Sequence, residues 1–135
     1  MSKITTRLGD NLRTISRVES VGADVQTDAT KTWGGLGELP SPGDLVGVAL
    51  GACILTVAAV AAQKGGFDFS SATISVEQEF SSGAKARITT IRVLASLPAS
   101  VPADARPAIE RALHTCPVGN SLLAEIDKTL DVEWV

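Results

Sequence analysis

The feature that most constrains the fold of this chain is an uncharged apolar stretch, LVGVALGACILTVAAVAA, which runs from Leu45 to Ala62 with Cys53 near its middle. Its length is close to the threshold for a helix that crosses a membrane. The stretch is rich in Ala and Gly, however, and no cluster of Lys or Arg flanks it to set an orientation in a bilayer. We therefore expect a buried helix in a globular protein, with no membrane association.

The residues before and after this stretch predict where the helix begins and ends. Ser41 suits the N-cap, Pro42 suits the first turn, and Asp44 completes a capping box. The Gly65-Gly66 pair after Lys64 is a typical stop signal.

A helix that is apolar on all sides must be covered on all sides, and one small domain has little material for that. A second subunit is the natural cover. The spacing of Gly47 and Gly51 would allow another helix to approach closely, although simple tight packing explains it equally well.

The remaining segments predict strands and short helices around the long helix. The expected elements are a hairpin within residues 3–28, an antiparallel pair formed by 72–80 and 87–95, a helix within 101–115, a short helix that starts at Pro117, and a strand at 129–135. No repeat or linker divides the chain, so we expect one domain over residues 1–135.

Composition narrows the function classes. The net charge is -3 and the 12 Lys and Arg residues are scattered, which argues against a nucleic-acid-binding surface. The N-terminal segment MSKITTRLGD contains no apolar run of the signal-peptide type, so a cytoplasmic location is expected. Two cysteines in such a chain are more often free thiols or a redox pair than a structural disulfide framework.

The two cysteines differ in their predicted surroundings. Cys53 lies mid-helix among apolar neighbours, where a thiol is normally protonated and inert unless a cation reaches it. Arg13 and Arg17, on the N-terminal hairpin, are the candidate cations. Cys116 directly precedes Pro117 at a helix start, where backbone N–H groups stabilise a thiolate. Local reasoning therefore makes Cys116 the more acidic thiol.

Other chemistries find little support in the sequence. His114 is the one histidine, and with two distant cysteines it lacks the ligand spacing of a metal site. It could serve as a base near Cys116, or simply occupy the last turn of a helix. The glycine-rich segment WGGLGELPSPG lacks the ending of a phosphate-binding loop. No metal or organic cofactor is expected.

Two motifs in this order, SPGDLVGVALGACILTVAAVAAQKG and HTCPVGNSL, resemble the OsmC/Ohr family of osmotically inducible and organic hydroperoxide resistance proteins, and LGDNLRT resembles its OsmC-like branch. The resemblance implies an α+β fold in which antiparallel sheets wrap around central helices in an intertwined homodimer. It also implies a thiol peroxidase in which Cys53 is the peroxide-attacking thiolate and Cys116 the resolving thiol. Arg13 would activate Cys53, with Arg17 as the alternative.

The family's organic hydroperoxide branch holds this arginine with a carboxylate ten residues before the first cysteine. That position is Gly43 here, so Glu38 or Asp44 is the candidate replacement. The resemblance further implies a peroxide substrate and, as reductant, an external dithiol or a lipoylated protein. The alternative is an OsmC-like protein that binds an apolar small molecule with little peroxidase turnover.

Overall fold

The long helix α1 (Pro42–Lys64) begins and ends as the sequence predicts in the computed structural model, which describes all 135 residues. Ser41 and Asp44 form the expected capping box: the Ser41 backbone N–H donates to Asp44 Oδ2 at 2.8 Å, and the Asp44 backbone N–H donates to Ser41 Oγ at 3.2 Å. Gly66, just past the helix, has a φ of 73°, which glycine adopts without strain.

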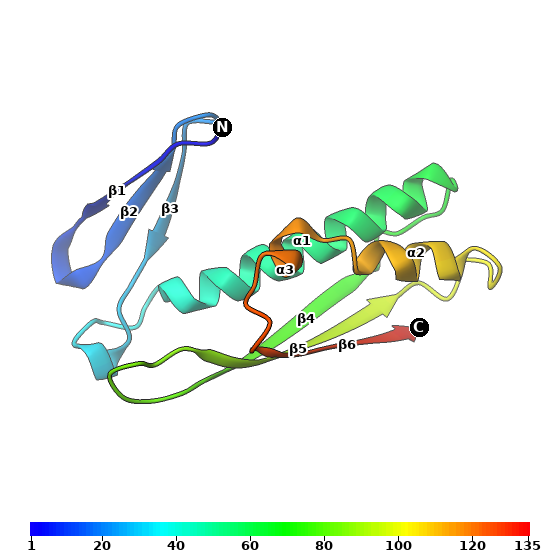
Figure 1. Cartoon of the computed structure of the whole chain (residues 1–135). Helices are drawn as coiled ribbons and strands as arrows, with labels where there is room; N and C mark the ends of the chain where they lie inside the picture. The colour runs from blue at the N-terminus through cyan, green and yellow to red at the C-terminus, as the bar shows by residue number, and fades with distance from the viewer. The chain divides into compact units, whose positions relative to one another are not determined.

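The chain divides into two compact units, residues 1–46 and 47–135. The first unit is built on an antiparallel sheet of β1 (Ile4–Leu8), β2 (Thr14–Val18) and β3 (Ala23–Thr27) (Figure 1). The expected hairpin is the β1–β2 pair. Strand β3 pairs with β2 as an additional strand, which its short, mostly polar sequence does not predict.

The second unit contains a mixed sheet in the order β4 (Thr73–Phe80), β5 (Ile88–Leu97), β6 (Asp127–Trp134). The antiparallel pairing of β4 with β5 is confirmed. Strand β6 then pairs with β5 in parallel, after a crossover through α2 (Arg106–Leu113) and α3 (Pro117–Asn120). Pro107 lies in the first turn of α2. Pro117 opens α3, as predicted.

The core of the second unit lies between the helices and one face of its sheet. Alternate residues of β5 are buried, while Arg92 and Leu94 between them are exposed. Helix α1 contributes a buried stripe at intervals of three and four residues, and α2 contributes Ile109 and Leu113. The core residues from these elements are Leu50, Ile54, Ala58, Ala62, Ile91, Val93, Ala95, Leu97, Ile109 and Leu113.

Two details of this packing refine the predictions. A Cβ at Gly47 would come within 2.8 Å of Gln78 Nε2, and one at Gly51 within 3.2 Å of Val76 Cγ2. Both glycines therefore allow α1 to pack closely against strand β4 of the same chain. Phe80 continues the apolar alternation of Ile74 and Val76 along β4, yet it is 54% exposed, because the register shifts between Glu79 and Phe80.

Candidate active site

Cys53 lies at the border of the buried stripe of α1. Its neighbours Leu50 and Ile54 are buried, each with 3% of its surface exposed, whereas Cys53 itself is half-buried and packs against the edge of the core. The sulfur is therefore placed by a rigid, well-capped helix. Rigid placement is what a reacting thiol requires if it is to meet a second group repeatedly in the same geometry.

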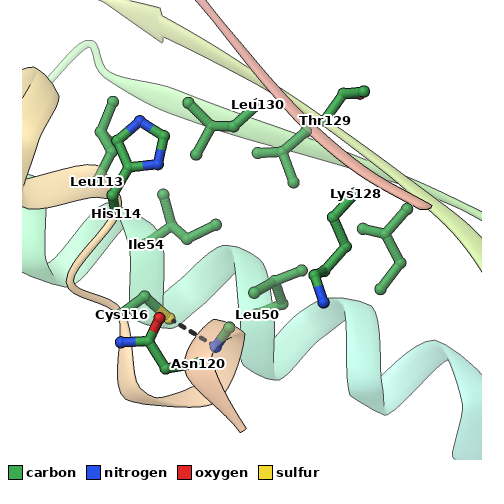
Figure 2. A pocket seen from close by; sticks show the side chains of 12 residues that line it. Leu50, Ile54, Leu113, His114, Cys116, Asn120, Lys128, Thr129 and Leu130 are labelled. Atoms are coloured by element: carbon green, nitrogen blue, oxygen red, sulfur yellow. Dashed lines mark hydrogen bonds between the residues drawn. The ribbon is translucent and has the colours of Figure 1, made fainter. Parts of the chain in front are cut away.

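Cys116 occupies the N-cap of α3, as the sequence predicts. Pro117 fixes the first turn, and the Gly119 backbone N–H donates to Cys116 Sγ at 3.3 Å (Figure 2). The residue is nevertheless buried, with 3% of its surface exposed. Cys116 thus combines the expected helix-start contact with burial of nearly all of its surface.

The two cysteine side chains lie within hydrogen-bonding reach of each other, and neither is in a disulfide. Burial raises the pKa of Cys116 above its usual range, and the hydrogen bond to Cys53 raises it further. The N–H groups of Gly119 and Val118 oppose this shift without cancelling it. The helix-start argument for a lowered pKa at Cys116 is therefore wrong, because desolvation outweighs the helix-start effect.

A cavity of about 210 Å³ opens beside Cys116 within the second unit. Its apolar walls come from α1, α2, β5 and β6, and its polar groups come from the α2–α3 turn, α3 and β6 (Figure 2). The lining includes Leu50, Ile54, Leu113, His114, Cys116, Asn120, Lys128, Thr129 and Leu130. Cys116 belongs to this lining and Cys53 does not.

Arg13 is held by two carboxylates within the first unit. Its guanidinium donates a hydrogen bond to Glu38, and its Nε lies 3.7 Å from Asp28 Oδ2. Glu38, one of the two carboxylates predicted to hold the arginine, thus pairs with it. Arg13 and Cys53 belong to different units, so their predicted contact stays a prediction.

Asp28 completes this group and was not predicted from the sequence. It has 1% of its surface exposed, and the Glu38 backbone N–H donates to Asp28 Oδ2 at 3.0 Å. This bond is the largest cause of a lowered pKa at Asp28, and the backbone of Leu36 and the charge of Arg13 lower it further against the effect of burial. In the sequence, Asp28 simply follows a mostly exposed strand, β3. Its role depends on the fold of the 28–38 loop, which brings the Glu38 backbone N–H to the Asp28 carboxylate.

The other two candidates in the first unit have different partners. Arg17 donates to the Gly22 carbonyl at 2.6 Å and to Asp24 Oδ1 at 3.1 Å, across the β2–β3 turn. Asp44 accepts from both the backbone N–H and the hydroxyl of Ser41, so its carboxylate is engaged in capping α1. His114 caps the end of α2 and lies at the cavity, exposed to solvent.

The family model for OsmC-like proteins matches residues 35–131, and the chain belongs to this family. The matched region contains both cysteines and the whole of α1. None of the curated proteins matches the sequence.

Solved structures confirm the OsmC/Ohr fold. A Psychrobacter arcticus protein named for osmotic stress induction and detoxification response superposes with a TM-score of 0.87 at 22% identity, covering 98% of this chain and 96% of that chain. An organic hydroperoxide resistance protein from Elizabethkingia anophelis gives 0.77 at 16% identity, covering 100% and 96%. Another from Legionella pneumophila gives 0.75 at 15% identity, covering 98% and 96%. The predicted α+β fold class is therefore confirmed.

Proposed function

We propose that the protein is a thiol-dependent peroxidase that reduces organic hydroperoxides, with hydrogen peroxide as a second substrate. The observation that carries this proposal is the meeting of Cys53 and Cys116, two free thiols distant in sequence that the fold of the second unit brings within hydrogen-bonding reach. Membership of the OsmC-like family supports it, as do the names of the Elizabethkingia and Legionella proteins of the same fold.

In the proposed reaction, the Cys53 thiolate attacks the terminal oxygen of the hydroperoxide and the O–O bond breaks. The alkoxide leaves and takes a proton to become an alcohol, and Cys53 becomes a sulfenic acid. Cys116 sulfur then attacks Cys53 sulfur, so that a disulfide forms and water leaves. An external dithiol or a lipoylated protein returns both cysteines to thiols by two exchange steps.

The assignment of Cys53 to the first step agrees with the surroundings of Cys116. Burial holds Cys116 in its protonated form at neutral pH, which suits a thiol that waits for the sulfenic acid rather than one that attacks peroxide first. Arg13, held by Glu38 and Asp28, is the proposed group that stabilises the Cys53 thiolate. Arg17 is the alternative, although its guanidinium already pairs with Asp24.

The proposal is tested by following consumption of tert-butyl hydroperoxide with dithiothreitol or glutathione as reductant. Wild-type protein should turn over with dithiothreitol and only weakly with glutathione. Cys53→Ser should be inactive, and Cys116→Ser should stop after one equivalent with its sulfenic acid trapped by dimedone. Full activity in Cys53→Ser would overturn the proposal, and loss of the first turnover in Cys116→Ser would reverse the two roles.

The cavity beside Cys116 supports a second candidate, a protein that binds an apolar small molecule and has little peroxidase turnover. Negligible consumption of peroxide with either reductant, together with saturable binding of a short-chain aliphatic probe, would favour it. We further propose that the protein is a cytoplasmic homodimer. The family relationship supports the dimer, and so does the apolar side of α1 that the single chain leaves exposed.

A further inference from the structure

A reductant can attack either sulfur of the proposed Cys53–Cys116 disulfide, and the cavity beside Cys116 distinguishes the two. Resting on the proposed peroxidase function, we propose that the reductant is an aliphatic dithiol that docks in this cavity and attacks Cys116 Sγ. Cys53 is then the leaving group. The docking site for the reductant thus lies at the resolving cysteine, on the side of the second unit formed by α1, α3 and β6.

The accessibility of the two sulfurs favours attack on Cys116. Cys116 has only 3% of its surface exposed, so a reagent reaches its sulfur through the cavity that it lines. Cys53 does not line this cavity, although the two thiols are within hydrogen-bonding reach. A molecule in the cavity therefore meets Cys116 and not Cys53.

The walls and the volume of the cavity suit a short aliphatic dithiol. Leu50, Ile54, Leu113 and Leu130 form apolar walls, whereas Asn120, Lys128 and Thr129 bring polar groups to the exposed side (Figure 2). An apolar engineered cavity of about 150 Å³ accommodates benzene. A volume of about 210 Å³ therefore suits a short aliphatic chain with its two sulfurs, and it is small for a charged tripeptide thiol.

The identity of the leaving group also favours attack on Cys116. In thiol–disulfide exchange, the sulfur with the lower pKa leaves faster. Attack on Cys53 would expel Cys116 as a thiolate into surroundings whose burial raises the pKa of that thiol. Attack on Cys116 avoids this unfavourable anion in the first, intermolecular step, because the sulfur that leaves is that of Cys53. Cys116 leaves only in the second step, where the tethered second thiol of the reductant drives the exchange by closing a ring.

The exchange balances in two steps. A thiolate of the dithiol attacks Cys116 Sγ, the Cys53–Cys116 bond breaks, and Cys53 leaves as a thiolate that takes a proton. The second thiolate of the reductant then attacks its own sulfur in the mixed disulfide, and Cys116 leaves and is protonated. The dithiol loses two electrons and two protons to become a cyclic disulfide, and the protein regains two thiols.

The test blocks the cavity and follows reduction alone. Thr129→Trp places a large side chain at the cavity, and Thr73→Trp is the matched control on an exposed position of β4 outside it. The disulfide is formed in each protein with diamide and its reduction by dithiothreitol is measured. Thr129→Trp should slow reduction about tenfold or more, and Thr73→Trp should leave the rate unchanged. Equal rates in the two variants overturn the proposal.

A second measurement keeps the test decisive if Thr129→Trp does not fold. Oxidised wild-type protein is mixed with 2-mercaptoethanol, quenched in acid, alkylated and mapped by mass spectrometry. The mixed disulfide should lie on Cys116 and the alkyl group on Cys53. The reverse pattern overturns the proposal. Failure of diamide to join the two cysteines also overturns it. Because diamide replaces peroxide, failure of the peroxidase function alone would appear separately, as a disulfide that diamide forms and peroxide does not.

Discussion

Arg13 Nε lies 3.7 Å from Asp28 Oδ2, and the same guanidinium donates to Glu38, so two carboxylates hold one arginine within the first unit. Asp28 is buried and Glu38 is exposed. The buried carboxylate is also tied to the loop by the Glu38 backbone N–H. The arginine is therefore positioned by residues that lie before Gly43, the position where the organic hydroperoxide branch carries its carboxylate.

Asp28→Asn should destabilise the protein at pH 7, because the amide cannot accept the same N–H bonds with a full negative charge beside Arg13. Folding lowers the pKa of Asp28 below its ordinary 3.8. The stabilisation is therefore present above that value and lost as the pH falls through the lower folded-state pKa. Urea unfolding from pH 7 to pH 2.5 should show the two proteins converging in acid. A constant difference across this range would contradict the prediction.

Arg13→Ala should slow formation of the Cys53 sulfenic acid about tenfold or more, which corresponds to about 1.4 kcal/mol of transition-state stabilisation. The reason is that peroxide attack needs the thiolate, which a guanidinium stabilises in apolar surroundings. Arg13→Lys should recover only part of the rate, because a point charge does not reproduce the planar fork of arginine. Stopped-flow measurement of the single turnover with tert-butyl hydroperoxide gives these rates.

Arg17→Ala is the matched control for Arg13→Ala. Its guanidinium is occupied by Asp24 and the Gly22 carbonyl on an exposed turn, so the effect on the rate should be small. A severe effect of Arg17→Ala with a silent Arg13→Ala would show that the activating arginine is Arg17. If neither changes the rate, the activating cation lies elsewhere in the chain.

The thiol of Cys116 should react slowly with iodoacetamide at neutral pH. In the Cys53→Ser variant, burial, the largest cause of the raised pKa at Cys116, remains in place. The pH profile of alkylation should therefore have its midpoint above the ordinary thiol value of 9.0. The same protein in urea is the control and should return to that ordinary value. A folded-state midpoint below 9.0 would restore the idea that Cys116 is the acidic thiol.

Sequence periodicity and end signals predicted most of this fold. Ser41, Pro42 and Gly66 fixed the limits of α1, and alternation identified β4 and β5, because capping and side-chain alternation are local properties. The parallel pairing of β6 with β5 was not predictable in this way, because strand order depends on contacts distant in sequence. Likewise, the bulge that exposes Phe80 leaves no trace in the hydrophobic pattern.

In the candidate site, too, local features were predictable from the sequence and features that depend on the fold were not. The helix-start position of Cys116 was visible in the sequence, but its burial was not, and burial decides the direction of its pKa shift. The pairing of Arg13 with Glu38 was among the sequence expectations, whereas Asp28 required the folded loop. Recognition of the family from two motifs supplied the roles of the cysteines, which remain proposals.

The apolar side of α1 gives the last prediction. Val48 and Val60 are 59% and 45% exposed in the single chain, and Ala52 between them is also exposed. Water contact on this side is unfavourable by about 25 cal/mol per Å² of apolar surface, so a second copy of the chain should cover it.

We therefore expect a homodimer at micromolar concentration in multi-angle light scattering. Ala52→Glu should weaken the dimer about tenfold or more, because a carboxylate would be buried without a partner. The matched control is Ala86→Glu in the exposed β4–β5 turn, which should leave the molar mass unchanged. A folded monomer of the wild-type chain at that concentration would remove the prediction, and an equal loss of dimer in both variants would place the interface on another surface.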